Sequence, residues 1–445
     1  MELFDQAARF HLDGKYKEAE ELYDKILTQN HKHPHLLATM GSLYLQMGKT
    51  GLAIALLEAS LNYDKTLQQS DILSNLGMAY YRSGQVEKAQ EYLERAVNMG
   101  DPAATTLAAY SALFVESGEP EKFVEAATKA IEKDPSLPIA HWNLALGLLA
   151  QGQWERAWDE YEWGLQSRGM RIDRKLKGVP YWDGTPGKVV AIYGEQGIGD
   201  EIMFASCLPD IMKTNTVILD CHKRLKTLFE KSFPGLKVYG DRENRNPEWV
   251  EKEHFDYQCS IGSLGKHYRR SRESFPGTPY LKAESLLPDG KFRVGVSWTG
   301  GLKEGRVRKR SVPLSWWKPI LNVVDCEFVS LQYTDCDEEL DLVGALGYDI
   351  KRFPEVHMDD YYETAKLVQS CDLVISVCTS VVHLAGALGV PCWCMTPKNP
   401  AWRYQDSGGM PWYRSVRLYR QPDTTQDSWF PVIKKIGFDL SDIQK

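Results

Sequence analysis

An acidic residue at the end of a glycine-rich turn is the first feature of this sequence that could do chemistry. The apolar run Val189–Tyr193 predicts a buried strand. The turn after it contains Gly194, Gly197 and Gly199 and ends at Asp200, where a helix is expected to begin. Glycines let a backbone approach a ligand closely, and ligands of parallel α/β sheets bind beyond the carboxyl ends of the strands. Asp200 is therefore a candidate for a role at a ligand site.

Two further carboxylates flank this turn. Glu195 begins the turn and is the alternative to Asp200, whereas Glu201 lies one step into the helix and is expected to stabilise its N-terminus. The glycines spell G-x-x-G-x-G instead of the dinucleotide-binding fingerprint, and Asp220 comes near the acidic position of that fingerprint. A nicotinamide-dependent enzyme is the weaker alternative, because a loose glycine match is weak evidence.

A second candidate site follows the apolar strand predicted over 372–377. Thr379 and Ser380 start a helix there, and His383 lies one turn further in. Free N–H groups and the helix dipole at such a start attract phosphate. The two hydroxyls either donate to that ligand or only cap the helix, and His383 is either a ligand contact or a core histidine. Arg310 ends a basic run that could neutralise a pyrophosphate, although most of the run is typical of a solvated loop.

Two patterns that could suggest metals lack the context that a metal site needs. Asp335-Cys336-Asp337 spells a metal-binding D-x-D sequence, but it opens an acidic segment and indicates the start of a helix. His31, His33 and His35 alternate in a loop without a cysteine or carboxylate partner at ligand spacing. We expect no metal site.

The first part of the chain repeats with a period of 34 to 36 residues. Each repeat has a turn glycine, an alanine or phenylalanine five residues later, and an aromatic residue or leucine four residues before it. This pattern over 1–165 resembles the tetratricopeptide repeat, with about five helix pairs. Such arrays present a surface to a peptide, another protein or the rest of their own chain, so acceptor recognition and self-association stay equal alternatives. The turn glycines are Gly14, Gly48, Gly84, Gly118 and Gly152.

After the repeats, residues 166–187 are expected to form a linker whose basic side chains are solvated and whose Tyr181-Trp182 pair anchors it. Strands and helices alternate over 188–285 and again over 290–425, which predicts two parallel sheets covered by helices. The end, 426–445, should form a helix that packs back toward the first of these halves.

The composition is ordinary for a globular protein, with 25% charged and 43% hydrophobic residues. A net charge of −7 argues against a dedicated nucleic-acid binder. Nine cysteines without a disulfide-like framework, no signal-peptide pattern and no long apolar run predict a cytoplasmic protein without a membrane span.

Four segments together resemble the heptosyltransferase-like glycosyltransferases of GT-B fold, in the group that carries tetratricopeptide repeats at the N-terminus. They are 194–200, 296–300 with Arg310-Ser311, 372–389, and 401–421 with Ala401-Trp402-Arg403 and Met410-Pro411-Trp412-Tyr413. The resemblance implies an α-solenoid followed by two Rossmann-like halves with a cleft between them. It assigns Asp200 as the general base, an acceptor side with Gly197, Gly199 and Glu195, and a nucleotide-sugar side with Trp298, Arg310, Gln332, Thr379, Ser380 and His383.

The reaction that this resemblance implies is the transfer of a sugar, with inversion, from a nucleotide-diphosphate donor to an acceptor hydroxyl. It implies no cofactor and no metal, and the acceptor could be a glycan, a protein or a modified nucleic-acid base. The family usually has an aspartate where this chain has Cys378. That departure favours the alternative function, a catalytically inactive scaffold whose repeats bind a partner and whose α/β part is a relic.

Overall fold

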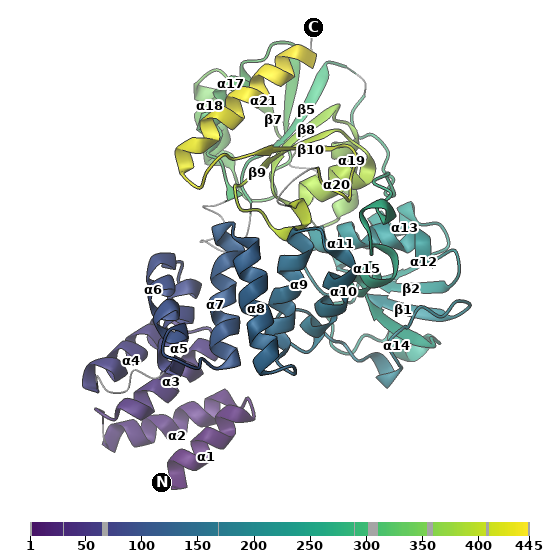
Figure 1. Cartoon of the computed structure of the whole chain (residues 1–445). Helices are drawn as coiled ribbons and strands as arrows, with labels where there is room; N and C mark the ends of the chain where they lie inside the picture. The colour runs from purple at the N-terminus through teal and green to yellow at the C-terminus, as the bar shows by residue number, and fades with distance from the viewer. Residues whose placement is uncertain are drawn as a thin grey trace. The chain divides into compact units, whose positions relative to one another are not determined.

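The computed structural model describes residues 2–29, 31–64, 70–167, 169–288, 290–300, 310–353, 359–405 and 409–443. Contacts divide the chain into two compact units, Met1–Gly147 and Leu148–Lys445. The first unit is helical, and the second holds two parallel sheets with their helices (Figure 1). The division falls inside the region predicted as repeats, so α10 belongs to the unit that contains the sheets.

The first unit is a tetratricopeptide-like solenoid of consecutive helix pairs (Figure 1). The glycines that the sequence singled out all have positive φ, a backbone conformation that strains other residues, and this is why glycine stands at each turn within a pair. The helices are α1 Glu2–Leu12, α2 Tyr16–Gln29, α3 Pro34–Gln46, α4 Thr50–Tyr63, α5 Ser70–Arg82, α6 Val86–Val97, α7 Ala104–Ser117 and α8 Pro120–Lys133, with α9 Pro138–Ala150 crossing the division and α10 Trp154–Tyr161 following it.

Small residues bring the two helices of a pair together, as the repeat pattern predicted. A Cβ atom at Gly41 of α3 would lie 2.6 Å from the side chain of Leu57 on α4, and one at Gly77 of α5 would lie 2.5 Å from Leu93 on α6. These close approaches let the leucines fill the groove of the facing helix. His33, one of the loop histidines, caps α3 by accepting a hydrogen bond from the backbone N–H of Leu36 at 3.2 Å.

The first sheet is parallel and has the strand order β3-β2-β1-β4. Its central strand β1 is the apolar run that the sequence indicated, and α11 begins just beyond its carboxyl end. The strands are β1 Val189–Tyr193, β2 Thr216–Asp220, β3 Lys237–Tyr239 and β4 Tyr257–Ser260, and the helices are α11 Ile198–Phe204, α12 Leu208–Ile211, α13 Lys226–Ser232, α14 Trp249–Lys252 and α15 Leu264–Tyr268.

The second sheet is also parallel, with the order β10-β9-β8-β5-β6-β7. Its strand β8 leads directly into α20, the predicted phosphate-binding helix. The strands are β5 Phe292–Ser297, β6 Cys326–Ser330, β7 Ile350–Lys351, β8 Leu373–Val377, β9 Cys392–Thr396 and β10 Val416–Arg420, and the helices are α17 Lys318–Leu321, α18 Asp337–Ala345, α19 Tyr361–Gln369, α20 Ser380–Leu388 and α21 Trp429–Ile443. The D-x-D sequence stands at the start of α18, as predicted.

The C-terminal helix forms where it was predicted, but the expectation that it packs toward the first half was wrong. In Figure 1, α21 lies beside α17 of the second half. Its residues Trp429, Ile433 and Leu440 are buried in the core of the second sheet, and Gly437 lies against the backbone of Pro319. Burial of this apolar stripe on its own sheet decides the position of the helix.

The linker also differs from the prediction. Arg171 and Arg174 were expected to be solvated, but the Arg171 side chain is fully buried and that of Arg174 is 6% exposed. Arg174 pairs with the buried carboxylate of Asp220 at 2.5 Å. Of the predicted anchor pair, Trp182 is confirmed, since its ring lies 4.5 Å from the ring of His267, whereas Tyr181 is 47% exposed. The linker is thus fixed to the first sheet by ion pairs and an aromatic contact.

No described helix has the length and hydropathy that would let it cross a membrane.

Candidate functional site

The helix that carries Asp200 packs against the start of α20. A Cβ atom at Gly199 would lie 3.1 Å from the ring of His383 and 3.3 Å from Cα of Ser380, so glycine allows the closest approach of the two helices here. Since α11 follows β1 and α20 follows β8, the carboxyl edges of the two sheets meet at this contact. The structure therefore brings together the two candidate sites that the sequence had suggested separately.

Asp200 forms an ion pair with Arg403, a residue of the second half. The two side chains are 19% and 16% exposed, so the pair is largely shielded from water. Burial opposes the charge on Arg403, but the Asp200 carboxylate together with Tyr404 and Tyr161 outweighs burial and raises the pKa of the arginine. The Nε atom of Arg403 is buried and has no hydrogen-bond partner among the described residues. Asp200 and Arg403 thus form a charged pair across the two halves.

The start of α20 is built as a capped helix N-terminus. Thr379 is the N-cap, and its hydroxyl accepts a hydrogen bond from the backbone N–H of Val381 at 3.2 Å. Ser380 has its hydroxyl 2.7 Å from the hydroxyl of Tyr361. The cap satisfies one N–H group of the first turn, and unsatisfied N–H groups at such a terminus favour an anion.

His383 lies one turn further along α20 and is 4% exposed. Burial, together with the charge of Arg403, lowers its pKa to about 3, so its imidazole is neutral near pH 7. Its Nδ1 atom is 3.3 Å from the hydroxyl of Tyr413. At this position the histidine can exchange hydrogen bonds but does not supply positive charge.

Arg310 is the one residue of the predicted basic run that the structure describes, and 301–309 lie outside the described residues. Its charge reaches Cys378, which directly precedes the cap of α20. Burial opposes ionisation of the Cys378 thiol, but a hydrogen bond with Cys394 and the charge of Arg310 lower its pKa overall. The two sulfur atoms are 3.8 Å apart. The structure thus places Arg310 near the end of β8, where the diphosphate was predicted.

Gln332 and Trp298 organise the backbone at the end of β5. The Gln332 Oε1 atom accepts hydrogen bonds from the backbone N–H groups of Trp298 and Thr299 at 3.2 and 3.1 Å. The Trp298 ring is fully buried in the core, and its indole N–H donates to Glu339 at 3.0 Å. Trp298 therefore supports this loop by packing in the core, and its ring has no exposed face that a nucleotide-sugar could contact.

Glu195 does not reach the candidate site as the sequence had allowed, whereas Glu201 lies in the first turn of α11, as predicted. The Glu195 carboxylate is fully buried, accepts hydrogen bonds from Arg171 Nε at 3.0 and 3.2 Å, and lies 3.0 Å from the Ser260 hydroxyl. Glu201 is also fully buried and, besides its place in the first turn of α11, forms an ion pair with Arg242. Both carboxylates hold the loops of the first sheet together, which leaves Asp200 as the partly exposed carboxylate of this turn.

Arg403, Tyr413 and Tyr361 complete the site, and sequence reasoning gave none of them a role. Arg403 and Tyr413 lie in two of the segments on which the family resemblance rests. The arginine next to Trp402 was the feature of the sequence that could have pointed to this part of the site. Their contacts with Asp200 and His383 join positions more than 25 residues apart in the chain, which no local pattern encodes. Within the described residues, no three His, Cys, Asp or Glu side chains are grouped to hold a metal.

Comparison with known proteins identifies the repeats. Residues 35–101 match the tetratricopeptide repeat family. Protein FlbA of Caulobacter vibrioides is 31% identical over 349 residues, which cover 72% of this chain and 57% of FlbA, so the chain spans little more than half the length of that relative.

Solved structures that resemble part of the chain include a tetratricopeptide-repeat protein. TTC0263 of Thermus thermophilus is 18% identical to this chain and has a TM-score of 0.34. The match covers 38% of this chain and 90% of TTC0263. MamA is 21% identical, with 36% and 92% of the two chains covered and a TM-score of 0.30. From the family match, the N-terminal region contains tetratricopeptide repeats, and two parallel α/β sheets follow it.

Proposed function

We propose that this chain is an inverting glycosyltransferase that moves a sugar from a nucleotide-diphosphate donor to an acceptor hydroxyl. One observation carries the proposal. Asp200, beyond the carboxyl end of β1, lies beside the N-terminus of α20, beyond the carboxyl end of β8. A carboxylate that can take a proton and a helix end that can hold a diphosphate are thus adjacent, at the edges where parallel sheets bind ligands. The GT-B arrangement and the roles below belong to this proposal.

In the proposed reaction, Asp200 accepts the proton of the acceptor hydroxyl as its oxygen attacks the anomeric carbon. The bond from that carbon to the diphosphate oxygen breaks in the same displacement, and the diphosphate leaves with the electron pair. Positive charge and N–H donors stabilise such a leaving group, and Arg310 with the first turn of α20 supplies both. Neutral His383 can donate one hydrogen bond but adds no charge.

Arg403 has a separate part in this proposal. Its guanidinium holds the Asp200 carboxylate at the meeting point of the two halves. The acceptor hydroxyl must share or replace this contact when it binds. We place the reaction in the cytoplasm and without a metal cofactor.

The binding part of the proposal is tested by titration calorimetry with uridine, guanosine, adenosine and cytidine diphosphates and their hexose derivatives. At least one should bind, and Arg310→Ala should weaken that binding by about 1.5–3 kcal/mol, which corresponds to about 10- to 150-fold. Lys318→Ala is the matched control, because Lys318 is an exposed cation of the same half. Equal affinities of the Arg310→Ala variant and the unchanged chain would reject the role of Arg310.

A second candidate function is a scaffold whose repeats bind a protein partner while the α/β part is catalytically silent. The distribution of charge favours it: residues 1–147 contain 20 acidic and 13 basic side chains, whereas 148–445 contain 40 of each. An acidic array attracts a basic partner, and that attraction weakens with salt. Failure of every nucleotide and nucleotide-sugar to bind would favour this function over the enzyme.

A further inference from the structure

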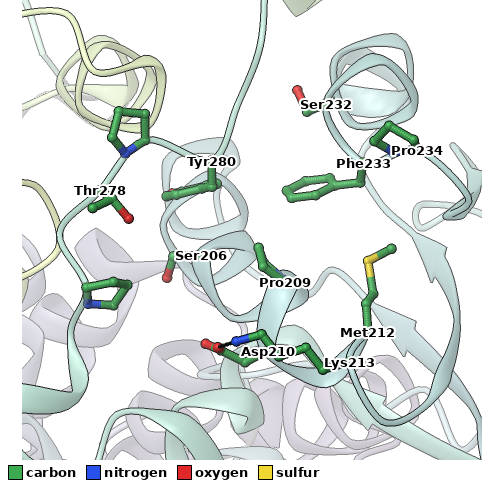
Figure 2. A pocket seen from close by; sticks show the side chains of 12 residues that line it. Ser206, Pro209, Asp210, Met212, Lys213, Ser232, Phe233, Pro234, Thr278 and Tyr280 are labelled. Carbon is green, nitrogen blue, oxygen red and sulfur yellow. Dashed lines mark hydrogen bonds and ion pairs between the residues drawn. The ribbon is translucent and has the colours of Figure 1, made fainter.

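A cavity of about 520 Å³ lies in the second unit, and its walls include neither Asp200 nor the start of α20 (Figure 2). It is bounded by α12, the end of α13 and the segment 276–280, which connects the two halves. Small-molecule sites commonly have volumes of about 300–1,000 Å³, so the size fits a compact ligand. The walls are formed by Ser206, Pro209, Asp210, Met212, Lys213, Ser232, Phe233, Pro234, Pro276, Thr278, Pro279 and Tyr280.

The walls combine apolar rings with uncharged hydroxyls. Figure 2 labels Tyr280, Phe233 and Pro209 among the side chains that line the cavity. Hydroxyl groups come from three residues besides Tyr280, and the remaining apolar surface comes mostly from prolines. The charged groups of the wall are Asp210 and Lys213, whose side chains lie 3.0 Å apart, so the wall holds one acidic and one basic group. A wall without net charge does not favour an anion or a cation over a neutral ligand.

The groups that would contact a ligand are held in place before it binds. Tyr280 donates its backbone N–H to Ala387 at 2.9 Å and its hydroxyl to the carbonyl of Ile202 at 2.6 Å, which fixes the ring. Asp210 accepts a hydrogen bond from the buried Arg269 at 2.9 Å. A preorganised wall binds without the cost of ordering its side chains.

Ser206 gives an independent sign of a ligand. It is 6% exposed, and its buried hydroxyl interacts with the thiol of Cys207, which is only a weak hydrogen-bond partner. Buried polar groups are almost always paired, by protein or by another molecule. In Figure 2, Ser206 lies between Tyr280 and Asp210, so a ligand that contacts both could also pair with this hydroxyl.

We propose that this cavity binds a neutral saccharide ring. A sugar has an apolar C–H face that can lie on the ring of Tyr280, and an edge of hydroxyls that can donate to Asp210 and exchange hydrogen bonds with Ser206. A phosphorylated ligand would need cationic donors, and the cation of this wall, Lys213, is already paired. The cavity walls include none of the proposed catalytic residues, although the Tyr280 hydroxyl lies 3.3 Å from that of Tyr413, and saccharide binding there does not require sugar transfer.

The experiment is ligand-observed NMR on the full chain, with methyl β-glucopyranoside and its 2-acetamido analogue as probes and without nucleotide. At least one probe should show saturable binding, with a dissociation constant on the order of millimolar. Thr278→Trp fills the cavity from an exposed position and should weaken binding by about tenfold or more. Thr424→Trp, an exposed threonine outside the cavity, should leave binding unchanged.

The ring contact is tested at Tyr280. Tyr280→Phe keeps the ring and should keep binding, whereas Tyr280→Leu should weaken it by about two- to tenfold. Affinity for the neutral probe should be the same at low and high salt. The proposal is overturned by the absence of saturable binding of both probes, by binding that survives Thr278→Trp, by salt-sensitive preference for glucose 6-phosphate, or by displacement with a proline-rich peptide instead of a saccharide. None of these outcomes depends on whether the chain transfers sugar.

Discussion

Replacing Asp200 by Asn separates a catalytic carboxylate from a structural one. Asparagine keeps the shape and a hydrogen-bond acceptor for Arg403, but it cannot take a proton. If Asp200 is the general base, turnover should fall by about 100- to 10,000-fold, the usual share of general-base catalysis. Donor affinity should barely change, because the proposed donor contacts lie on the other half of the unit.

The structure also sets the expected loss of stability. The Asp200–Arg403 pair has side chains 19% and 16% exposed, which places it between a surface ion pair and a fully buried one. Surface pairs contribute up to about 1 kcal/mol, and breaking buried pairs costs about 3–5 kcal/mol. We therefore expect Asp200→Asn to lower the free energy of unfolding by about 1–3 kcal/mol. Denaturant titration measures this loss separately from turnover.

Two variants distinguish the base from a mere contact between the halves. Arg403→Gln breaks the same ion pair but keeps the carboxylate, so its turnover should exceed that of Asp200→Asn by a wide margin. Asp439→Asn is the matched control for stability, since Asp439 is 11% exposed and pairs with Arg417 and Lys435 on the second half. Assays use the donor that calorimetry identifies, with release of the nucleoside diphosphate as the signal.

Wild-type-like turnover in Asp200→Asn, with a folded protein, would refute the reasoning. Equal losses of turnover in Asp200→Asn and Arg403→Gln would also refute it, because they would show that the ion pair matters and the proton acceptor does not. Glu195 could not then inherit the role in this conformation, because its carboxylate is fully buried against Arg171.

Three further predictions concern stability. His383 has a pKa of about 3 in the folded state and near 6.5 in the unfolded state, so between these values only the unfolded state binds the extra proton. Lowering the pH from 7 to 5 should therefore reduce the free energy of unfolding by about 2 kcal/mol more in wild type than in His383→Gln. Denaturant titration at both pH values measures this difference. Gly386→Ala would place a Cβ atom against the ring of Tyr413 and should lower the free energy of unfolding by about 1–3 kcal/mol. Gly344→Ala, whose Cβ atom would have no other atom within 4 Å, should leave stability unchanged. Equal melting temperatures of the two variants would contradict this packing. Arg171→Gln breaks a buried ion pair and should lower the free energy of unfolding by about 3–5 kcal/mol. The exposed Arg245→Gln should lower it by at most about 0.5 kcal/mol. A small loss in Arg171→Gln would show that this linker arginine is not an essential anchor.

Local patterns in the sequence were enough for the elements and for the joints between strands and helices. The glycine period placed the turns of the helix pairs, because glycine relieves the strain of positive φ wherever the pair must turn tightly. The apolar runs indicated β1 and β8, because buried parallel strands are apolar on both faces. Thr379 at the start of α20 followed from the preference of hydroxyl side chains for caps. Each of these features depends on residues within a few positions of one another.

The partners of the charged and apolar side chains were decided by the tertiary structure alone. Arg171 has the sequence context of a solvated linker residue, and only the folded chain brings it to Glu195, 24 residues away. Arg403 and Asp200 form an ion pair although they are 203 residues apart in the chain. The apolar face of α21 packs on the second sheet and not on the first. Periodicity tells which side chains must be buried or paired, but the choice among equivalent partners depends on which elements pack together, and that is settled by the whole core at once.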